Sequence, residues 1–203
     1  IRTPLAVSQG YLKLYVDGRL TAPDDQRRAF QQTREALGVI AGLCAEMSNV
    51  SALADAEAPR LLERIAPAHL ANELKAAADL AGVTWSEAQL PTARIATNAP
   101  ADLIRAAAVA IRVAFDEEKN APHVIDVRAH DDALVIRAGA TPGLDALPLA
   151  PDGPGAVPVN VVRGGKGLSL IWATFVFGQH GIQAWSHRDH KGSVGLRIPL
   201  VNI

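Results

Sequence analysis

The sequence predicts an α+β protein built in two parts, an antiparallel helical hairpin over residues 1–55 and an α/β sandwich over residues 56–203. In the first part, apolar side chains recur at alternating spacings of three and four, which is typical of packed helices. In the second part, short runs rich in Val and Ile alternate with longer apolar segments, which is typical of a sheet covered by helices. With 203 residues and 49% hydrophobic side chains, the chain is long enough for two small domains.

The composition of the chain excludes several classes of function. With 20 basic and 21 acidic side chains, it has no charge bias toward nucleic acid or anionic membranes. The apolar run 103–115 is interrupted by Arg105 and Arg112, so we expect no membrane contact. The one cysteine, Cys44, excludes an intrachain disulfide and is typical of a reducing, cytoplasmic setting. Because the chain does not begin with Met, we expect further residues upstream.

Two helices are predicted in the hairpin. The first ends at Asp17-Gly18, and Pro23 begins the second, with acidic residues near the positive end of its dipole. Heptad-like spacing gives the helices an apolar seam that a single hairpin cannot cover. We therefore predict a homodimer that forms a four-helix bundle, with packing of the hairpin on its own domain as the alternative. The predicted dimer seam consists of Leu5, Leu12, Phe30, Leu37, Ile40 and Cys44. Cys44 is expected there as a small core residue.

The sandwich is predicted element by element, after a connecting segment over residues 51–63. The expected elements are a helix over 68–81, a strand over 83–87, a short strand at 94–96, a helix over 100–117, strands over 124–129 and 133–138, a helix over 168–179, and a hairpin of 181–188 with 194–200. The two middle strands are joined at Asp131-Asp132 as a tight hairpin. Five prolines and several glycines predict that 139–165 is a loop.

The first five residues, Ile-Arg-Thr-Pro-Leu, resemble the second half of the dimerisation and phosphoacceptor motif of two-component sensor histidine kinases. Near the end of the chain, residues 165–170, 179–181, 192–193 and 196–200 resemble that family's Gly-x-Gly-Leu-Gly-Leu, His-Gly-Gly and Gly-x-Gly-(Ser/Thr)…Pro-Leu landmarks. The order of the expected elements is also similar. The resemblance spans the chain and implies the ATP-binding sandwich that histidine kinases share with gyrase, Hsp90 and MutL.

The resemblance implies a phosphoacceptor site at the front of the first helix. The family's His would lie two residues before Ile1, flanked by Arg2 and Thr3. Thr3 resembles the residue that orients water when such proteins dephosphorylate a receiver. A response-regulator receiver domain would dock on the outward face of this helix, at Ala6, Gln9, Gly10 and Lys13.

The positions that the resemblance gives to nucleotide binding carry the wrong side chains. Val113 stands where the family has the Asn that binds Mg²⁺, and Val has no lone pair for a cation that takes oxygen ligands. The acidic run 116–118 follows, and its charges would repel phosphates. Gly139 stands in place of the Asp that accepts a hydrogen bond from adenine, and Gly143 ends the same segment. We expect no ATP or Mg²⁺ on this chain, with Mg²⁺ supplied by the partner receiver.

A glycine-rich loop at Gly165, Lys166 and Gly167 could still hold an anion at the start of a helix. The alternative, which we prefer, is that these glycines only form a tight turn into the helix. His187 and His190 share a charged hairpin tip, but a third ligand is missing, so no metal site is predicted.

Three functions are compatible with the sequence. The first is a phosphorelay protein that exchanges a phosphoryl group between the expected histidine and receiver aspartates without using ATP itself. The second is a non-catalytic pseudokinase dimer that binds and regulates a response regulator or a kinase. The third is an active sensor histidine kinase with a divergent ATP site. Whether the chain is an enzyme therefore stays open, with a histidine phosphotransferase preferred over an ATP-dependent kinase.

Overall fold

The computed structural model describes residues 2–54, 63–80, 83–97, 99–118, 120–159, 167–190 and 192–201. The chain divides into two compact units, Ile1–Ala52 and Leu53–Ile203. Each unit is described by itself.

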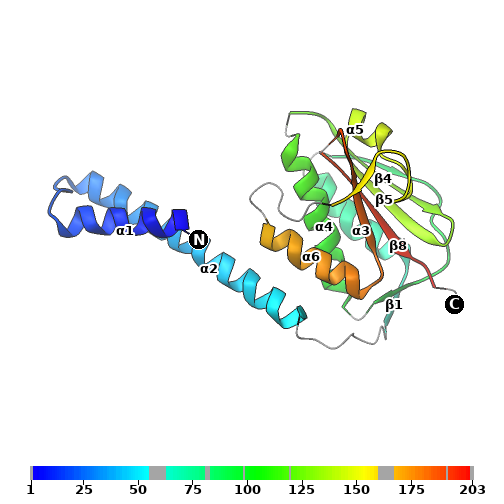
Figure 1. The fold of residues 1–203 in the computed structure, drawn as a ribbon, viewed down its shortest axis with the longest axis horizontal. Helices are drawn as coiled ribbons and strands as arrows, with labels where there is room; N and C mark the ends of the chain where they lie inside the picture. Colours follow the sequence, from blue (N-terminus) through cyan, green and yellow to red (C-terminus); the bar gives the residue numbers. More distant parts are fainter. Residues whose placement is uncertain are drawn as a thin grey trace. The chain divides into compact units, whose positions relative to one another are not determined.

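The first unit is a hairpin of two helices, α1 (Arg2–Val16) and α2 (Pro23–Ala54) (Figure 1). Gly18 ends α1 with a φ of 66°, a left-handed conformation that glycine adopts without a steric penalty. Helix α2 begins with Pro23 and carries Asp24 and Asp25 in its first turn. Both predicted helices are present, and α2 continues into the segment that was expected to be a connection.

Small side chains form the inner face of the hairpin. Ser8 on α1 and Ala29, Thr33 and Ala36 on α2 are all buried. The hydroxyl of Ser8 donates a hydrogen bond to the carbonyl oxygen of Pro4 at 3.0 Å, so its burial leaves no donor unsatisfied. These side chains occupy little space, so most of the large apolar residues of the hairpin are left for its outer surface.

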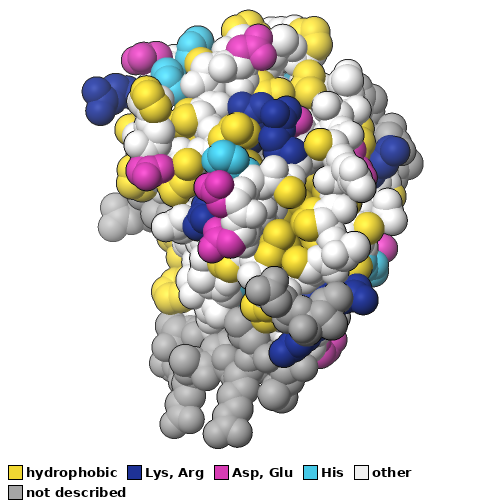
Figure 2. Space-filling view, turned by 90° about the vertical axis from the view of Figure 1, so that its right-hand side faces the viewer, with side chains coloured by type: hydrophobic (Ala, Val, Ile, Leu, Met, Phe, Trp, Pro, Cys, Tyr) yellow, Lys and Arg dark blue, Asp and Glu magenta, His cyan; other side chains and the backbone are white. Residues whose placement is uncertain are grey.

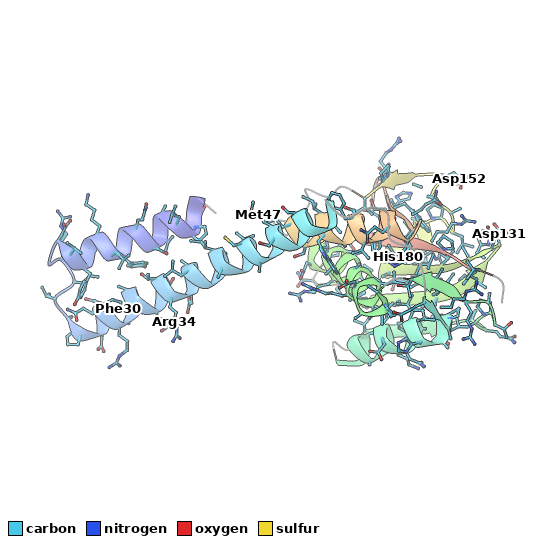
Figure 3. The ribbon with its side chains drawn as sticks, turned by 90° about the horizontal axis from the view of Figure 1, so that it is seen from below. Phe30, Arg34, Met47, Asp131, Asp152 and His180 are labelled. Atoms are coloured by element: carbon cyan, nitrogen blue, oxygen red, sulfur yellow. The ribbon has the colours of Figure 1, made fainter. Side chains whose placement is uncertain are left out.

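The predicted dimer seam divides into two groups in the structure. Ile40 is half-buried, on the same side of α2 as buried Thr33. The others are exposed, namely Leu5, Leu12, Phe30, Leu37 and Cys44. Cys44 is therefore not a core residue of the single hairpin, and its expected place in the core of the dimer seam stays a prediction. The alternating three–four spacing could not separate the two groups, because neighbouring faces of one helix share the same period. Phe30, labelled in Figure 3, contacts Tyr15 of α1 with 5.1 Å between ring centroids.

The second unit is an α/β sandwich. Its helices are α3 (Pro67–Leu80), α4 (Pro100–Glu117), α5 (Thr141–Ala146) and α6 (Gly167–Gln179). Its strands are β1 (Glu63–Ile65), β2 (Thr84–Glu87), β3 (Ile95–Thr97), β4 (His123–His130), β5 (Ala133–Ala140), β6 (Ala156–Pro158), β7 (Gln183–His187) and β8 (Ser193–Pro199). Six strands form one sheet in the order β2-β4-β5-β8-β7-β6, in which β2 and β4 are parallel and the other neighbours antiparallel. Strands β1 and β3 form a separate antiparallel pair.

Helices α3, α4 and α6 cover one face of the six-stranded sheet (Figure 1). Alternate residues of the central strands point to this face and are fully buried, including Leu134 and Ile136 of β5 and Leu196 of β8. The guanidinium group of Arg105 on α4 lies 4.6 Å from the ring centroid of Trp172 on α6, which ties the two helices together.

The opposite face of the sheet is covered by the segment that was predicted to be a loop. Residues 141–146 form α5 and residues 156–158 form β6, so that prediction is wrong. Leu147 packs with Val135 and Trp185 in a buried cluster on this face. The indole of Trp185 lies over Gly195, where an added Cβ would come within 2.3 Å of the ring, and its Nε1 donates to the carbonyl oxygen of Pro148 at 3.2 Å.

A buried ion cluster fastens α5 to the same face. The carboxylate of Asp126 on β4 accepts hydrogen bonds from Arg128 at 2.7 Å and from Arg137 on β5 at 2.8 Å. Arg137 also donates to the carbonyl oxygens of Leu144 at 3.4 Å and Leu147 at 2.8 Å. One guanidinium group therefore neutralises a buried charge and satisfies the end of a helix.

The stability of the sandwich should depend on pH through Asp126. Burial acts to raise the pKa of this carboxyl, but hydrogen bonds and charge from Arg128 and Arg137 outweigh it and hold the pKa below the usual 3.8. A lowered pKa in the folded state gives a stabilisation that is complete above about pH 4 and is lost as the pH falls through the folded-state value. We expect the unfolding temperature to drop below about pH 4, and to drop less in Asp126→Asn, as measured by circular dichroism. Equal acid sensitivity of the two proteins would contradict this assignment.

Candidate functional site

The side chain of Val113 is buried on the flank of α4 that faces α6 and β8. It lines a cavity of about 10 Å³ with Leu170 of α6 and Val194 of β8. A cavity needs roughly 10–15 Å³ to hold one water molecule, and small-molecule pockets usually measure about 300–1,000 Å³. The side chains described at this position therefore leave almost no space around Val113.

Gly139 and Gly143 lie against the start of β8. Gly139 pairs with Ser193 across the β5–β8 ladder, and an added Cβ would come within 2.8 Å of the carbonyl oxygen of Gly192. Gly143 lies in α5, where a Cβ would be 3.3 Å from Cβ of His190. The close approach that these glycines permit is therefore an approach to the protein's own backbone and side chains.

An acidic residue at the end of α4 also lies close to the start of β8. The side chain of Glu118 lies against Gly192, where an added Cβ would come within 2.6 Å of its Cγ. The hydroxyl of Ser193 donates to the carbonyl oxygen of His190 at 2.8 Å. The structure thus brings Val113, Gly139 and Gly143 together around Ser193, with His190 beside Gly143 and the side chain of Glu118 beside Gly192.

The predicted anion loop is only partly described. Gly165 and Lys166 lie outside the described residues, and Gly167 is the first residue of α6. Neither anion binding nor the preferred structural role of these glycines is tested.

His180, in the segment that resembles the family's His-Gly-Gly landmark, is buried inside the sandwich (Figure 3). Its Nδ1 lies 2.7 Å from the carbonyl oxygen of Val176, and its Nε2 lies 2.9 Å from the hydroxyl of buried Thr97. Because a carbonyl only accepts, Nδ1 carries the proton and Nε2 accepts from Thr97. The Thr97 oxygen in turn accepts the backbone N–H of Ala99 at 3.1 Å. This chain of hydrogen bonds fastens α6 to the start of α4.

The expected docking residues share one exposed face of α1. Ala6, Gln9, Gly10 and Lys13 are all exposed, on the side away from buried Ser8. Thr3 is exposed as well, and Arg2 is the first residue of the helix. Docking at these positions stays a prediction.

Sequence reasoning placed Glu118 in the acidic run beside the expected Mg²⁺ position and Leu170 in a family landmark, but it missed their contacts, and it missed His190 as a neighbour of the site. Their contacts join residues far apart in the chain, so periodicity gave no signal for them. Ser193 was part of a recognised landmark, but its pairing with Gly139 emerges only from the register of β5 and β8.

The described residues contain no group of three or more His, Cys, Asp or Glu placed to hold a metal ion. Nor do they include a helix that is both long and apolar enough to cross a bilayer. On the face shown in Figure 2, basic side chains are interspersed with acidic and apolar ones and form no continuous stripe.

Adding a side chain at Gly139 should destabilise the sheet. Gly139→Ala forces the backbone of β8 to shift, since the nearest atoms include a carbonyl oxygen and a Cα. Overpacking of this kind costs about 1–3 kcal/mol. Gly178→Ala is the matched control, because nothing lies within 4 Å of that position in α6, and there the exchange should be neutral or slightly stabilising. Urea unfolding of both variants checks this, and equal stability of the two would contradict the packing described.

The chain is similar to known proteins in its structure, whereas its sequence has no match. No family model matches the sequence, and no curated protein matches it. In structure, the chain is similar to the Acinetobacter baumannii histidine kinase AdeS, with a TM-score of 0.59, 15% identity, and coverage of 99% of this chain and 97% of that chain. It is also similar to full-length ShkA in complex with AMPPNP, with a TM-score of 0.59 and 16% identity. That match covers 100% of this chain and 44% of ShkA, so the chain spans less than half of ShkA. The mixed α+β architecture expected from the sequence is confirmed, and the chain has the fold of a histidine-kinase core.

Proposed function

We propose that this chain is a phosphorelay protein of a two-component system. In this proposal it exchanges a phosphoryl group between a histidine, expected just before Ile1, and the aspartate of a response-regulator receiver. It does so without using ATP itself. The histidine-kinase fold supports the general setting, and the residues at the nucleotide positions support the loss of ATP chemistry.

The observation that carries the proposal is the closure around Val113. A nucleotide with its metal ion needs an oxygen ligand at this place and room for its phosphates. The chain supplies an aliphatic side chain and a cavity of about 10 Å³. Glu118 adds a carboxylate beside Gly192, where phosphate would be repelled. These residues do not fit Mg-ATP, so no step of the proposed function passes through it.

Phosphoryl exchange needs little from the sandwich. When the expected histidine donates, its N–P bond breaks as a carboxylate oxygen of the receiver forms a new P–O bond, and the nitrogen recovers its lone pair. The reverse reaction loads the histidine from a phosphorylated receiver. In this proposal the receiver supplies the Mg²⁺ that neutralises the moving phosphoryl group, and the α1 face of Ala6, Gln9, Gly10 and Lys13 supplies the docking surface. Thr3 would orient water when the receiver is dephosphorylated.

A dimer through the hairpin belongs to the same proposal. We define the outer stripe as the five exposed residues of the predicted seam, Leu5, Leu12, Phe30, Leu37 and Cys44. At 3.6 residues per turn, the stripe lies roughly 50° from buried Ser8 on α1 and roughly 70° from the centre of the buried positions on α2, in the same angular sense. Because α1 and α2 are antiparallel, both halves of the stripe then lie on one side of the hairpin. A second hairpin placed on that side would complete a four-helix bundle.

Radiolabelled phosphotransfer tests the proposed exchange. A protein that includes the residues upstream of Ile1 is incubated with a receiver phosphorylated on its aspartate, and label should move to the protein. Replacing the expected histidine by Gln should abolish the labelling. Absence of label on the unaltered protein, despite measurable binding of the receiver, would reject phosphotransfer in favour of the pseudokinase alternative.

A further inference from the structure

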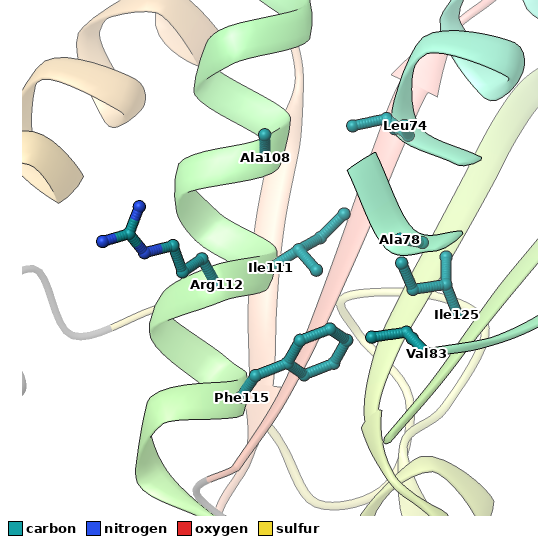
Figure 4. Close-up of a pocket in the computed structure, with 8 residues that line it drawn as sticks. All are labelled: Leu74, Ala78, Val83, Ala108, Ile111, Arg112, Phe115 and Ile125. Carbon is teal, nitrogen blue, oxygen red and sulfur yellow. The ribbon is translucent and has the colours of Figure 1, made fainter. Parts of the chain in front are cut away.

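A pocket of about 280 Å³ opens between α3 and α4 over the sheet (Figure 4). We propose that it binds an uncharged apolar small molecule about the size of two fused six-membered rings. The proposal does not depend on the phosphorelay. The residues that line the pocket are Leu74, Ala78, Val83, Ala108, Ile111, Arg112, Phe115 and Ile125.

Three elements of the sandwich supply the apolar walls. Leu74 and Ala78 come from α3, Ile111 and Phe115 from α4, and Ile125 from β4 below them. In Figure 4, these side chains point toward one another across the space between the two helices. Val83, Ala108 and Phe115 are only half-buried, so the pocket can be reached from solvent. A well-formed apolar hollow lined by three separate elements is therefore the kind of feature that a ligand occupies.

The lining determines the charge of the ligand. Arg112 is the one charged residue among the described residues that line the pocket, and Figure 4 shows its side chain directed away from the apolar cluster. A charged group pushed into the pocket would lose its hydration without gaining a partner. The ligand is therefore uncharged.

The volume determines its size. An apolar cavity of about 150 Å³ lined by Leu, Ile and Phe is sufficient to bind benzene. The pocket here has a little under twice that volume, which corresponds to a bicyclic molecule such as naphthalene or indole. The ring of Phe115 offers an aromatic wall against which a flat molecule can stack or pack edge to face.

The pocket is separate from the nucleotide positions. Ile111 and Phe115 line the pocket, whereas Val113 lines the small cavity shared with Leu170. Two residues along a helix are about 200° apart, so the pocket and that cavity lie on opposite flanks of α4. A ligand in the pocket would hold α3 and α4 together without occupying the space near Val113.

Titration of the whole chain with naphthalene tests the proposal, using the methyl resonances of the lining residues as the readout. We expect saturable shifts confined to Leu74, Val83, Ile111 and Ile125, with the methyl groups of Leu134 and Ile198 unmoved. Ala78→Leu should fill the pocket and weaken binding about tenfold or more. Ala76→Leu, on the exposed side of the same helix, should leave the affinity unchanged.

Three results would overturn the proposal. These are the absence of saturable shifts, shifts spread through the whole core, and unchanged affinity in a folded Ala78→Leu protein. The methyl spectrum without naphthalene reports whether that variant folds. Should it not fold, Ala108→Leu is used instead, because Ala108 also lines the pocket and is only half-buried; unchanged affinity there would equally overturn the proposal.

Discussion

Leu37→Glu should convert the proposed dimer to monomers. Leu37 is at the centre of the outer stripe and is 51% exposed in the single hairpin, so a partner hairpin would bury it. Burying a Leu side chain contributes about 1.5–3 kcal/mol, and a symmetric dimer loses this contribution twice. A total loss of about 3–6 kcal/mol corresponds to a weakening of roughly 10²–10⁴-fold in the dimer dissociation constant. Sedimentation equilibrium measures this change directly.

Val39→Glu is the matched control for Leu37→Glu. Val39 is on the same helix and is 54% exposed, nearly the same as Leu37, but it lies off the outer stripe. The same charge placed there should leave the dimer intact. Cys44, the single cysteine, gives an independent readout, because it is exposed in the single hairpin and should react slowly with maleimide in the dimer. Equal effects of the two Glu substitutions, or a wild-type monomer, would contradict the four-helix bundle.

Arg137→Met should strongly destabilise the sheet face covered by α5. It removes a partner of Asp126, whose side chain is only 5% exposed, and it also frees the carbonyl oxygens of Leu144 and Leu147. Removing one partner of a buried ion pair typically costs about 3–5 kcal/mol. We expect about 3 kcal/mol here, because Arg128 still contacts the carboxylate. A loss of that size lowers Tm by roughly 6–12 °C.

Arg197→Met provides the comparison for Arg137→Met. Arg197 pairs with Asp132, whose side chain is 81% exposed, so the same substitution removes a surface ion pair. Such pairs contribute about 0–1 kcal/mol. Thermal and urea unfolding of the two variants should therefore differ by about 2 kcal/mol or more. Similar losses in both would show that Arg137 does not hold α5 in the way described.

The elements that could be predicted from the sequence carry their own local signals. Helix α4 begins at Pro100, and the first turn of a helix is where a proline is tolerated best. The apolar periodicity of the helix continues to its predicted end. The β4–β5 hairpin turns at Asp131, whose φ of 53° is a conformation that Asp tolerates better than most residues. In both cases local chemistry and tertiary packing favour the same structure.

The elements that could not be predicted depend on distant contacts. Helix α5 is only six residues long and is held by Arg137 from the neighbouring strand, so its prolines and glycines alone indicated a loop. Strand β6 exists because it pairs with β7. In the hairpin, the sequence pattern located the apolar residues but not the face that each occupies, because small residues rather than large ones fill the inner face.

In the candidate site, too, some features follow from local sequence and others depend on distant contacts. That Val113 cannot bind Mg²⁺ follows from its chemistry and needed no structure. How closely Leu170 and Val194 surround it, and that Glu118 lies against Gly192, depend on the packing of α4 between α6 and β8. The chemistry of a single side chain could therefore be predicted from the sequence, whereas the packing of its neighbours could not.

Calorimetric titration of the chain with Mg-ATP tests the central claim most directly. We expect no saturable heat at nucleotide concentrations up to the millimolar range, because Val113 stands where the family's metal-binding Asn is expected and the described side chains leave a cavity of only about 10 Å³ beside it. The same protein should nevertheless accept label from a phosphorylated receiver once the upstream histidine is included. Saturable binding of Mg-ATP that is lost in Val113→Phe would contradict the account and support an active kinase with a divergent site.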